Sequence, residues 1–193
     1  MTIPTPCIVR ESSAGLERFT IADTMLQRRE IWCVGEINGE SAVSLILQLH
    51  HLEHEDPTAP ITMYINSPGG SVSDGLAVLD TMCALKAPIT TVCVGEAASM
   101  GALLFVSGQE RLMLPNACLM IHDPLTLGIS GSALEVERKT KRLMKTRETI
   151  ARILSEATGN TPEEILAKTS VDCYFDAKEA LEFGLADRIV HEI

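Results

Sequence analysis

Aromatic residues are scarce in this chain of 193 residues, which has one tryptophan, two tyrosines and four phenylalanines. Long apolar runs are missing too, because the longest apolar run without a charge, around 97–108, contains serines and glycines and is too short to span a bilayer. Basic residues are outnumbered by acidic ones, 16 to 26, and the net charge of −10 argues against a nucleic-acid partner. With a hydrophobic fraction of 46%, the chain has the composition of one soluble globular domain over 1–193.

Cysteine pairs of the C-x-x-C type are also absent, which argues against a zinc site or a disulfide framework. Most of the six cysteines lie in apolar stretches and are predicted to be buried thiols of a cytosolic protein: Cys7, Cys33, Cys83, Cys93, Cys118 and Cys173. Residues 1–10 lack a basic region followed by an apolar core, so we expect no secretory signal and a cytoplasmic location.

Short apolar runs alternate with helical patterns from Ile31 onward. The predicted strands are 31–34, 61–65, 89–94, 111–114 and 118–121. The predicted helices are 41–54, 74–86, 99–107 and 132–158, then one that begins at Thr161 and one that ends at Gly184. Strands that alternate with helices predict an α/β fold of repeated βαβ units around a largely parallel sheet.

Residues 95–101, G-E-A-A-S-M-G, follow a predicted strand and open a predicted helix. Ser99 would therefore occupy a tight strand-to-helix turn with small neighbours, much like the nucleophile of an α/β-hydrolase. The amide groups at the start of the helix would favour a developing oxyanion. The alternative is that Ser99 is only a helix N-cap.

Two further segments carry candidate chemistry. Residues 67–70, S-P-G-G, follow a strand, and their glycines allow backbone amides to approach a ligand closely, although a plain turn is the alternative. His122 ends another predicted strand, where sites in parallel sheets are commonly built, and is a candidate general base. His50 and His54 share a helix face, but no third metal ligand is evident. Composition alone leaves the acid partner of His122 open among four candidates: Asp123, Asp172, Asp176 and Asp187.

In their order along the chain, four segments together resemble the proteolytic subunit of the Clp protease. Residues 64–70 resemble its glycine-rich segment, 97–102 its nucleophile segment, and 120–124 its histidine segment. Asp172, with Ala177, Glu179, Ala180, Gly184 and Leu185 after it, resembles its aspartate segment. The similarity runs from about Pro4 to the C-terminus.

This resemblance implies a ClpP/crotonase-like fold and a serine endopeptidase. Ser99 would be the nucleophile, His122 the base and Asp172 the acid that orients it. Backbone amides of Gly69 and Met100 would form the oxyanion hole. Substrate would bind as an added strand along seven further positions: Gly70, Ser71, Val72, Pro124, Leu125, Thr126 and Leu127.

The resemblance also implies partners. Seven-membered rings would stack in pairs, or pair with a ring of a paralogue, and receive unfolded polypeptides from an ATP-driven AAA+ unfoldase. Residues 1–18 would be a flexible N-terminal axial segment, and about 125–158 the handle between rings. This chain itself would need no metal or cofactor, since it has no G-x-x-x-x-G-K-[ST] loop and ATP would be used by the unfoldase.

Several positions differ from the family pattern. Asp123 and Glu96 replace amide residues beside the histidine and the serine. Ser170 and Val171 replace an acid and an arginine that join rings, while Thr62 and Ala84 replace aromatic residues of the unfoldase-docking pocket. Two other functions therefore remain to be weighed: a weakly active or non-catalytic ring component that assists an active paralogue, and a crotonase-type acyl-CoA enzyme.

Overall fold

The computed structural model describes residues 6–13, 15–126 and 128–193. Its main sheet contains the strands β3 (Glu30–Val34), β4 (Ile61–Ser67), β5 (Ile89–Ala98), β6 (Glu110–Met113), β7 (Cys118–Ile121), β8 (Cys173–Asp176) and β9 (Arg188–Ile189). The order is β3-β4-β5-β6-β9, and β7 pairs with both β5 and β8. Every pairing is parallel except that of β7 with β8, so the predicted α/β class and largely parallel sheet are confirmed.

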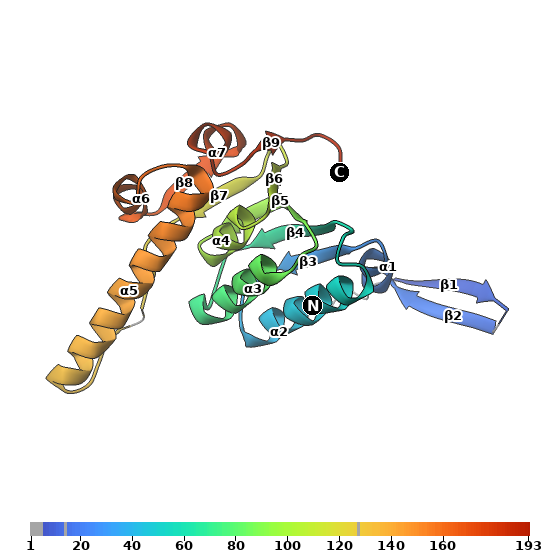
Figure 1. Cartoon of the computed structure of the whole chain (residues 1–193), viewed down its shortest axis with the longest axis horizontal. Helices are drawn as coiled ribbons and strands as arrows, with labels where there is room; N and C mark the ends of the chain where they lie inside the picture. The colour runs from blue at the N-terminus through green and yellow to red at the C-terminus, as the bar shows by residue number, and fades with distance from the viewer. Residues whose placement is uncertain (1–5, 14, 127) are drawn as a thin grey trace.

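The helices are α1 (Ile21–Gln27), α2 (Gly39–Glu55), α3 (Val72–Ala84), α4 (Met100–Val106), α5 (Ala133–Thr158), α6 (Pro162–Thr169) and α7 (Ala177–Phe183). Figure 1 shows α2, α3 and α4 side by side along one face of the sheet, while α5 projects away from it. Helix α2 packs through Leu45, Leu49 and Leu52, which recur at helical spacing and are buried. All seven residues of α4 are buried, so this helix lies inside the core.

Strand β5 is long enough to pair with two neighbours in succession. Its first half, 90–93, pairs with β6, and its last residues, 96–98, pair with β7. The carboxyl end of β5 therefore lies beside β7, at the edge where β4 also ends. Parallel strands commonly build their sites at this edge.

Local sequence signals set the helix ends in the second half of the chain. Ser132 begins α5 with a capping box, and Gly159 ends it in the left-handed conformation. Thr161 and Asp176 cap α6 and α7 in the same way, and Gly184 ends α7. These boundaries confirm the predicted ends. No helix in the described part of the chain is both long and apolar enough to cross a membrane.

The first strands were not predicted. β1 (Cys7–Ser12) and β2 (Gly15–Thr20) pair as an antiparallel hairpin, with a register that runs from Cys7–Thr20 to Ser12–Gly15. The hairpin projects from the end of the molecule opposite α5 (Figure 1). Most of its side chains are exposed, so the hairpin buries no apolar face and its sequence shows no hydrophobic alternation. Its pairing depends on backbone hydrogen bonds.

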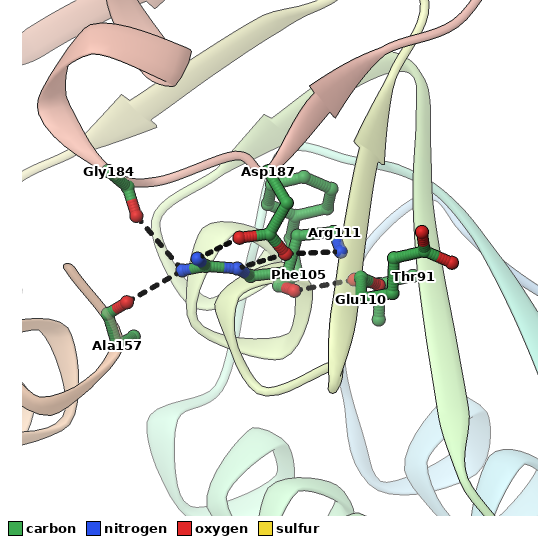
Figure 2. A network of polar contacts seen from close by, with 7 residues as sticks. All are labelled: Thr91, Phe105, Glu110, Arg111, Ala157, Gly184 and Asp187. Carbon is green, nitrogen blue, oxygen red and sulfur yellow. Dashed lines mark hydrogen bonds and ion pairs between the residues drawn. The ribbon is translucent and has the colours of Figure 1, made fainter.

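One guanidinium joins three distant elements (Figure 2). Arg111 of β6 donates from Nη1 to the carbonyl oxygens of Ala157 (2.8 Å) and Gly184 (2.9 Å), at the ends of α5 and α7. Its Nε donates to the Asp187 carboxylate at 3.0 Å. The hydrogen bond from Arg111 is the main cause that lowers the pKa of Asp187 below its ordinary value. This network holds the base of α5, the carboxyl-terminal end of the helix, against the sheet.

We expect Asp187→Asn to lower the free energy of unfolding by about 2–3 kcal/mol, because it leaves a largely buried guanidinium without its anion. For a chain of this size the melting temperature should fall by about 4–12 °C in calorimetry. Since the lowered pKa belongs to the folded state, this stabilisation is present above a pH of about 4 and is lost as the pH falls further. The difference in melting temperature between wild type and Asp187→Asn should therefore become smaller at acidic pH.

Glu156→Gln is the matched control, because it removes an acid from the exposed pair with Arg152 on the surface of α5. Its effect should stay below about 1 kcal/mol. Equal melting temperatures for wild type and Asp187→Asn at neutral pH would show that the network contributes little.

Candidate active site

Ser99 lies at the turn between β5 and α4 with φ 54° and ψ −118°. A non-glycine residue rarely adopts a positive φ, so the surrounding structure must hold it there. The Ser99 amide donates to the carbonyl of Met120 on β7 (2.8 Å), and the buried helix α4 follows immediately. Gly101 permits this packing, because a Cβ atom there would lie 2.9 Å from the Ser67 carbonyl oxygen.

The Ser99 side chain does not cap α4. Its Oγ lies 2.8 Å from Nε2 of His122, the residue that follows β7. The alternative interpretation, in which Ser99 is only a helix N-cap, is therefore wrong. A hydroxyl in hydrogen-bond contact with an imidazole is the arrangement that allows a serine to be deprotonated as it attacks.

The other nitrogen of the imidazole, Nδ1, is buried and has no hydrogen-bond partner among the described residues. Asp172 Oδ1 lies 3.8 Å from it, within ion-pair distance but beyond a hydrogen bond. The Asp172 side chain is 62% exposed, while that of His122 is 10% exposed. A shift of about 1 Å would complete a Ser–His–Asp chain, and such contacts are often long in the absence of substrate.

The remaining three candidate acids have other partners. Asp123 accepts from Arg147 Nε (2.6 Å) and from Thr169 Oγ1 (2.9 Å). Asp176 caps α7, and Asp187 binds Arg111. Of the four acids left open by the sequence, Asp172 is the one that the structure brings to His122.

The predicted oxyanion donors lie next to each other. A Cβ atom on Gly69 would be 2.8 Å from Ser99 Cβ and 3.0 Å from the Met100 nitrogen, so only glycine allows this approach. The amide of Met100 is one of the first in α4, which have no acceptor within the helix. The Gly69 amide, however, donates to Ser67 Oγ at 3.1 Å. A substrate carbonyl oxygen would therefore share the Gly69 amide with Ser67 Oγ, or replace Ser67 Oγ as its acceptor.

Gly70 has φ 150°, and its backbone bridges to Ile37. Ser71 donates to the Ile37 carbonyl oxygen at 2.7 Å, and a Cβ atom on Gly70 would be 2.1 Å from that oxygen. The S-P-G-G segment is thus held against the β3–α2 loop on one side and against the Ser99 turn on the other.

A cavity of about 180 Å³ lies beside Ser99 and His122. Among the predicted substrate-binding residues, Gly70, Val72, Pro124 and Leu125 line it. Ser71 and Thr126 line an adjoining groove of about 610 Å³ together with those four, and Leu127 lies outside the described residues. The remaining walls of the cavity include apolar side chains that the sequence analysis did not assign to a site: Leu103, Ile121, Ile150 and Leu154. The i, i+4 spacing of the last two on α5 would have indicated an inward face.

Other candidate chemistry is not assembled. His50 and His54 join no group of three or more metal-ligating side chains within the described residues. All six cysteines are free thiols. Burial raises the pKa of Cys33 and of Cys93 to about 11, as expected for inert core thiols. Cys7 and Cys83 are exposed, so the prediction of burial is wrong for these two.

Three of the four segments that carry the family resemblance, 64–70, 97–102 and 120–124, line one apolar cavity. Asp172, from the fourth segment, lies 3.8 Å from His122 Nδ1. A protein-family model described as Clp protease matches residues 13–192. That match covers nearly the whole described chain, including β3 to β9 and all seven helices. The chain therefore belongs to the Clp protease family.

Proposed function

We propose that this chain is a serine endopeptidase that hydrolyses unfolded polypeptides, with Ser99, His122 and Asp172 as its catalytic residues. The observation that carries the proposal is the 2.8 Å contact of Ser99 Oγ with His122 Nε2, made from a turn with positive φ. Strained turns of this kind recur where a nucleophile must stand clear of its neighbours. The apolar cavity directly beside the pair offers a place for a substrate side chain.

The proposed reaction has two stages. Ser99 Oγ attacks the scissile carbonyl carbon while His122 Nε2 takes the hydroxyl proton. The carbonyl oxygen becomes an anion that the amides of Gly69 and Met100 stabilise. When the C–N bond breaks, His122 returns the proton to the leaving amine, and an acyl-Ser99 ester remains. Water, deprotonated by His122, then releases the acid and restores Ser99. Asp172 stabilises the imidazolium formed in each stage, and no metal or cofactor takes part.

The substrate side of the proposal rests on the two hollows beside Ser99. Apolar walls at Leu103, Ile150 and Leu154 favour an apolar substrate side chain before the scissile bond. Residues 70–72 and 124–126 line the adjoining groove. Binding there as an added strand uses main-chain hydrogen bonds, which tolerate many sequences.

Family membership supports assembly into rings that an AAA+ unfoldase supplies with substrate. Apolar side chains exposed in the single chain include Val43 and Leu47 on α2, and Leu134 and Met144 on α5. Such side chains suit contacts between subunits. Thr62 and Ala84 lack the aromatic rings expected of the docking pocket, so we propose a weak or altered unfoldase contact.

One observation favours a second function, a ring component with little activity of its own. The 3.8 Å separation of Asp172 from His122 and the unpartnered Nδ1 are features of a serine that is incompletely activated. A crotonase-type acyl-CoA enzyme is less well supported, because that chemistry has no need of the Ser99–His122 contact.

Ser99→Ala should reduce peptide hydrolysis by at least about 10³-fold, because the covalent nucleophile is lost. The assay uses a short peptide with leucine before the scissile bond, which suits the apolar cavity, and wild type should also react with a fluorophosphonate at Ser99. Ser107→Ala is the matched control at the other end of α4, where Oγ donates to Leu103 O, and should retain activity. Wild type that neither cleaves nor labels would favour the non-catalytic ring component, and turnover of an acyl-CoA instead would favour the crotonase-type enzyme.

Asp172→Asn should lower kcat by about 10²–10⁴-fold and change KM little, since an amide neither stabilises imidazolium nor supports the correct tautomer. Steady-state kinetics with the same peptide measure this split. Asp176→Asn is the control, because asparagine caps a helix as well as aspartate does, and it should remain near wild type. If Asp123→Asn is the crippling substitution and Asp172→Asn is mild, Asp123 is the acid.

We expect the chain alone to stack its rings weakly and to exist mainly as single rings or smaller species at low concentration. Ser170 and Val171 carry no charge where the family has an acid–arginine pair, and Val171 is 69% exposed. The start of α5 is highly charged and offers few apolar anchors, such as Leu134. Sedimentation velocity across a dilution series measures this. A fourteen-subunit particle that persists at nanomolar concentration would show that α5 suffices.

A further inference from the structure

The segment that carries Asp172 is bound at both ends to the residues on either side of His122. Cys173 pairs with Ile121 in the antiparallel β7–β8 ladder. On the other side, the Asp123 amide donates to the carbonyl oxygen of Thr169 at 2.7 Å. Only residues 170–172 lie between these two attachments. The position of Asp172 relative to His122 therefore depends on how firmly each attachment is held.

The β7–β8 attachment is part of a ladder, but the Thr169 attachment stands alone and is reinforced by side chains. Thr169 Oγ1 donates to Asp123 Oδ1 at 2.9 Å, and Thr169 is only 2% exposed. Arg147 reaches from α5 and donates from Nε to Asp123 Oδ2 at 2.6 Å. Its Nη2 lies 3.4 Å from the carbonyl oxygen of Leu166 on α6. Both oxygens of Asp123 are thus used, one for α6 and one for α5.

These contacts differ from an ordinary surface ion pair. The side chains of Arg147 and Asp123 are 26% and 32% exposed. Both bonds to the carboxylate are charge-assisted, and the one from Arg147 is short at 2.6 Å. By comparison, the i, i+4 pair Arg152–Glu156 on the same helix is about 60% exposed at each side chain. Asp123 is next to His122 in the sequence, and Thr169 is three residues before Asp172. Because both side chains are held in place, they can limit the movement of Asp172 relative to His122.

We propose that Asp123, Arg147 and Thr169 are positioning residues that hold the Asp172 segment against His122 within a single chain. This inference rests on the proposed peptidase function. When the Thr169 hydroxyl is removed, residues 170–172 should loosen at one end, and Asp172 should spend less time close to Nδ1. Thr169 lines neither the cavity nor the groove, so the effect should fall on kcat and leave KM in place.

The test compares Thr169→Val, which keeps the shape but removes the hydroxyl, with Thr169→Ser, which keeps the hydroxyl. Thr169→Val should lower kcat roughly 5- to 20-fold at nearly constant KM, and slow labelling of Ser99 by a fluorophosphonate to a similar degree. Thr169→Ser should stay within about two-fold of wild type. Thr149→Val, on the surface of α5 with Oγ1 donating to Lys145 O, and Arg152→Gln are matched controls that should change neither quantity.

Hydrogen exchange provides a readout that needs no activity. Mass spectrometry of peptides that cover residues 170–174 should show faster exchange in Thr169→Val than in wild type, Thr169→Ser or Thr149→Val. If the valine variant does not fold, Arg147→Gln removes the other support of the same carboxylate and is measured in the same way.

Each outcome bears on the inference. Unchanged kcat and exchange in Thr169→Val overturn it, as does a higher KM at constant kcat. Equal losses in the valine and serine variants, in step with the melting temperature, also overturn it by showing a purely structural role. If wild type shows no peptidase activity or labelling, the proposed function fails, and exchange alone then decides whether Thr169 anchors the segment.

Discussion

Ser99 is held at φ 54° between a largely buried strand and a helix buried along its whole length. A conformation of this kind costs about 1–3 kcal/mol and persists only where neighbouring contacts leave no alternative. Here the contacts are the Met120 carbonyl behind the Ser99 amide, and the glycines at 69 and 101 that allow the chain to close around the turn. The hydroxyl consequently points away from the helix amides and toward His122.

The candidate acids differ in the partners of their carboxylates. Three of the four candidate acids have fixed partners: Asp176 caps a helix, Asp187 binds Arg111, and Asp123 binds Arg147. Each of these negative charges is balanced by a fixed donor, which lowers the cost of placing it beside the core. Asp172 is different because it lies in a short exposed segment opposite the unpartnered nitrogen of His122. Among the described residues, no lysine or arginine forms an ion pair with Asp172, so this carboxylate is the one best able to respond to charge on the imidazole.

Much of the fold could be predicted because its signals are local. The spacing of Leu45, Leu49 and Leu52 predicts α2, and the Thr161 and Asp176 capping boxes predict the starts of two helices. The hairpin β1–β2 and the strand β8 escaped prediction because their pairing depends on backbone bonds to distant or exposed partners. In the site, the serine and histidine could be chosen from their positions after strands. Choosing among the acids from the residues alone was not feasible, since Asp123 is adjacent in sequence but turns to Arg147, a contact between residues 24 apart.

The contact of Arg147 with Asp123 offsets another departure from the family pattern, at Ser170 and Val171. Ser170 and Val171 stand where the resemblance places a charged pair between rings. If that pair were needed, the position of Asp172 would depend on a ring contact that we expect to be weak. Asp123, itself a departure, supplies an attachment within the chain, because its two oxygens bind Thr169 on α6 and Arg147 on α5. The base of α5 is in turn fastened to the sheet through Arg111 and the carbonyl of Ala157. The segment that carries the proposed acid is therefore connected to the sheet within one chain, through the contacts of Asp123 with Thr169 and Arg147, then along α5 to the contact of Ala157 with Arg111.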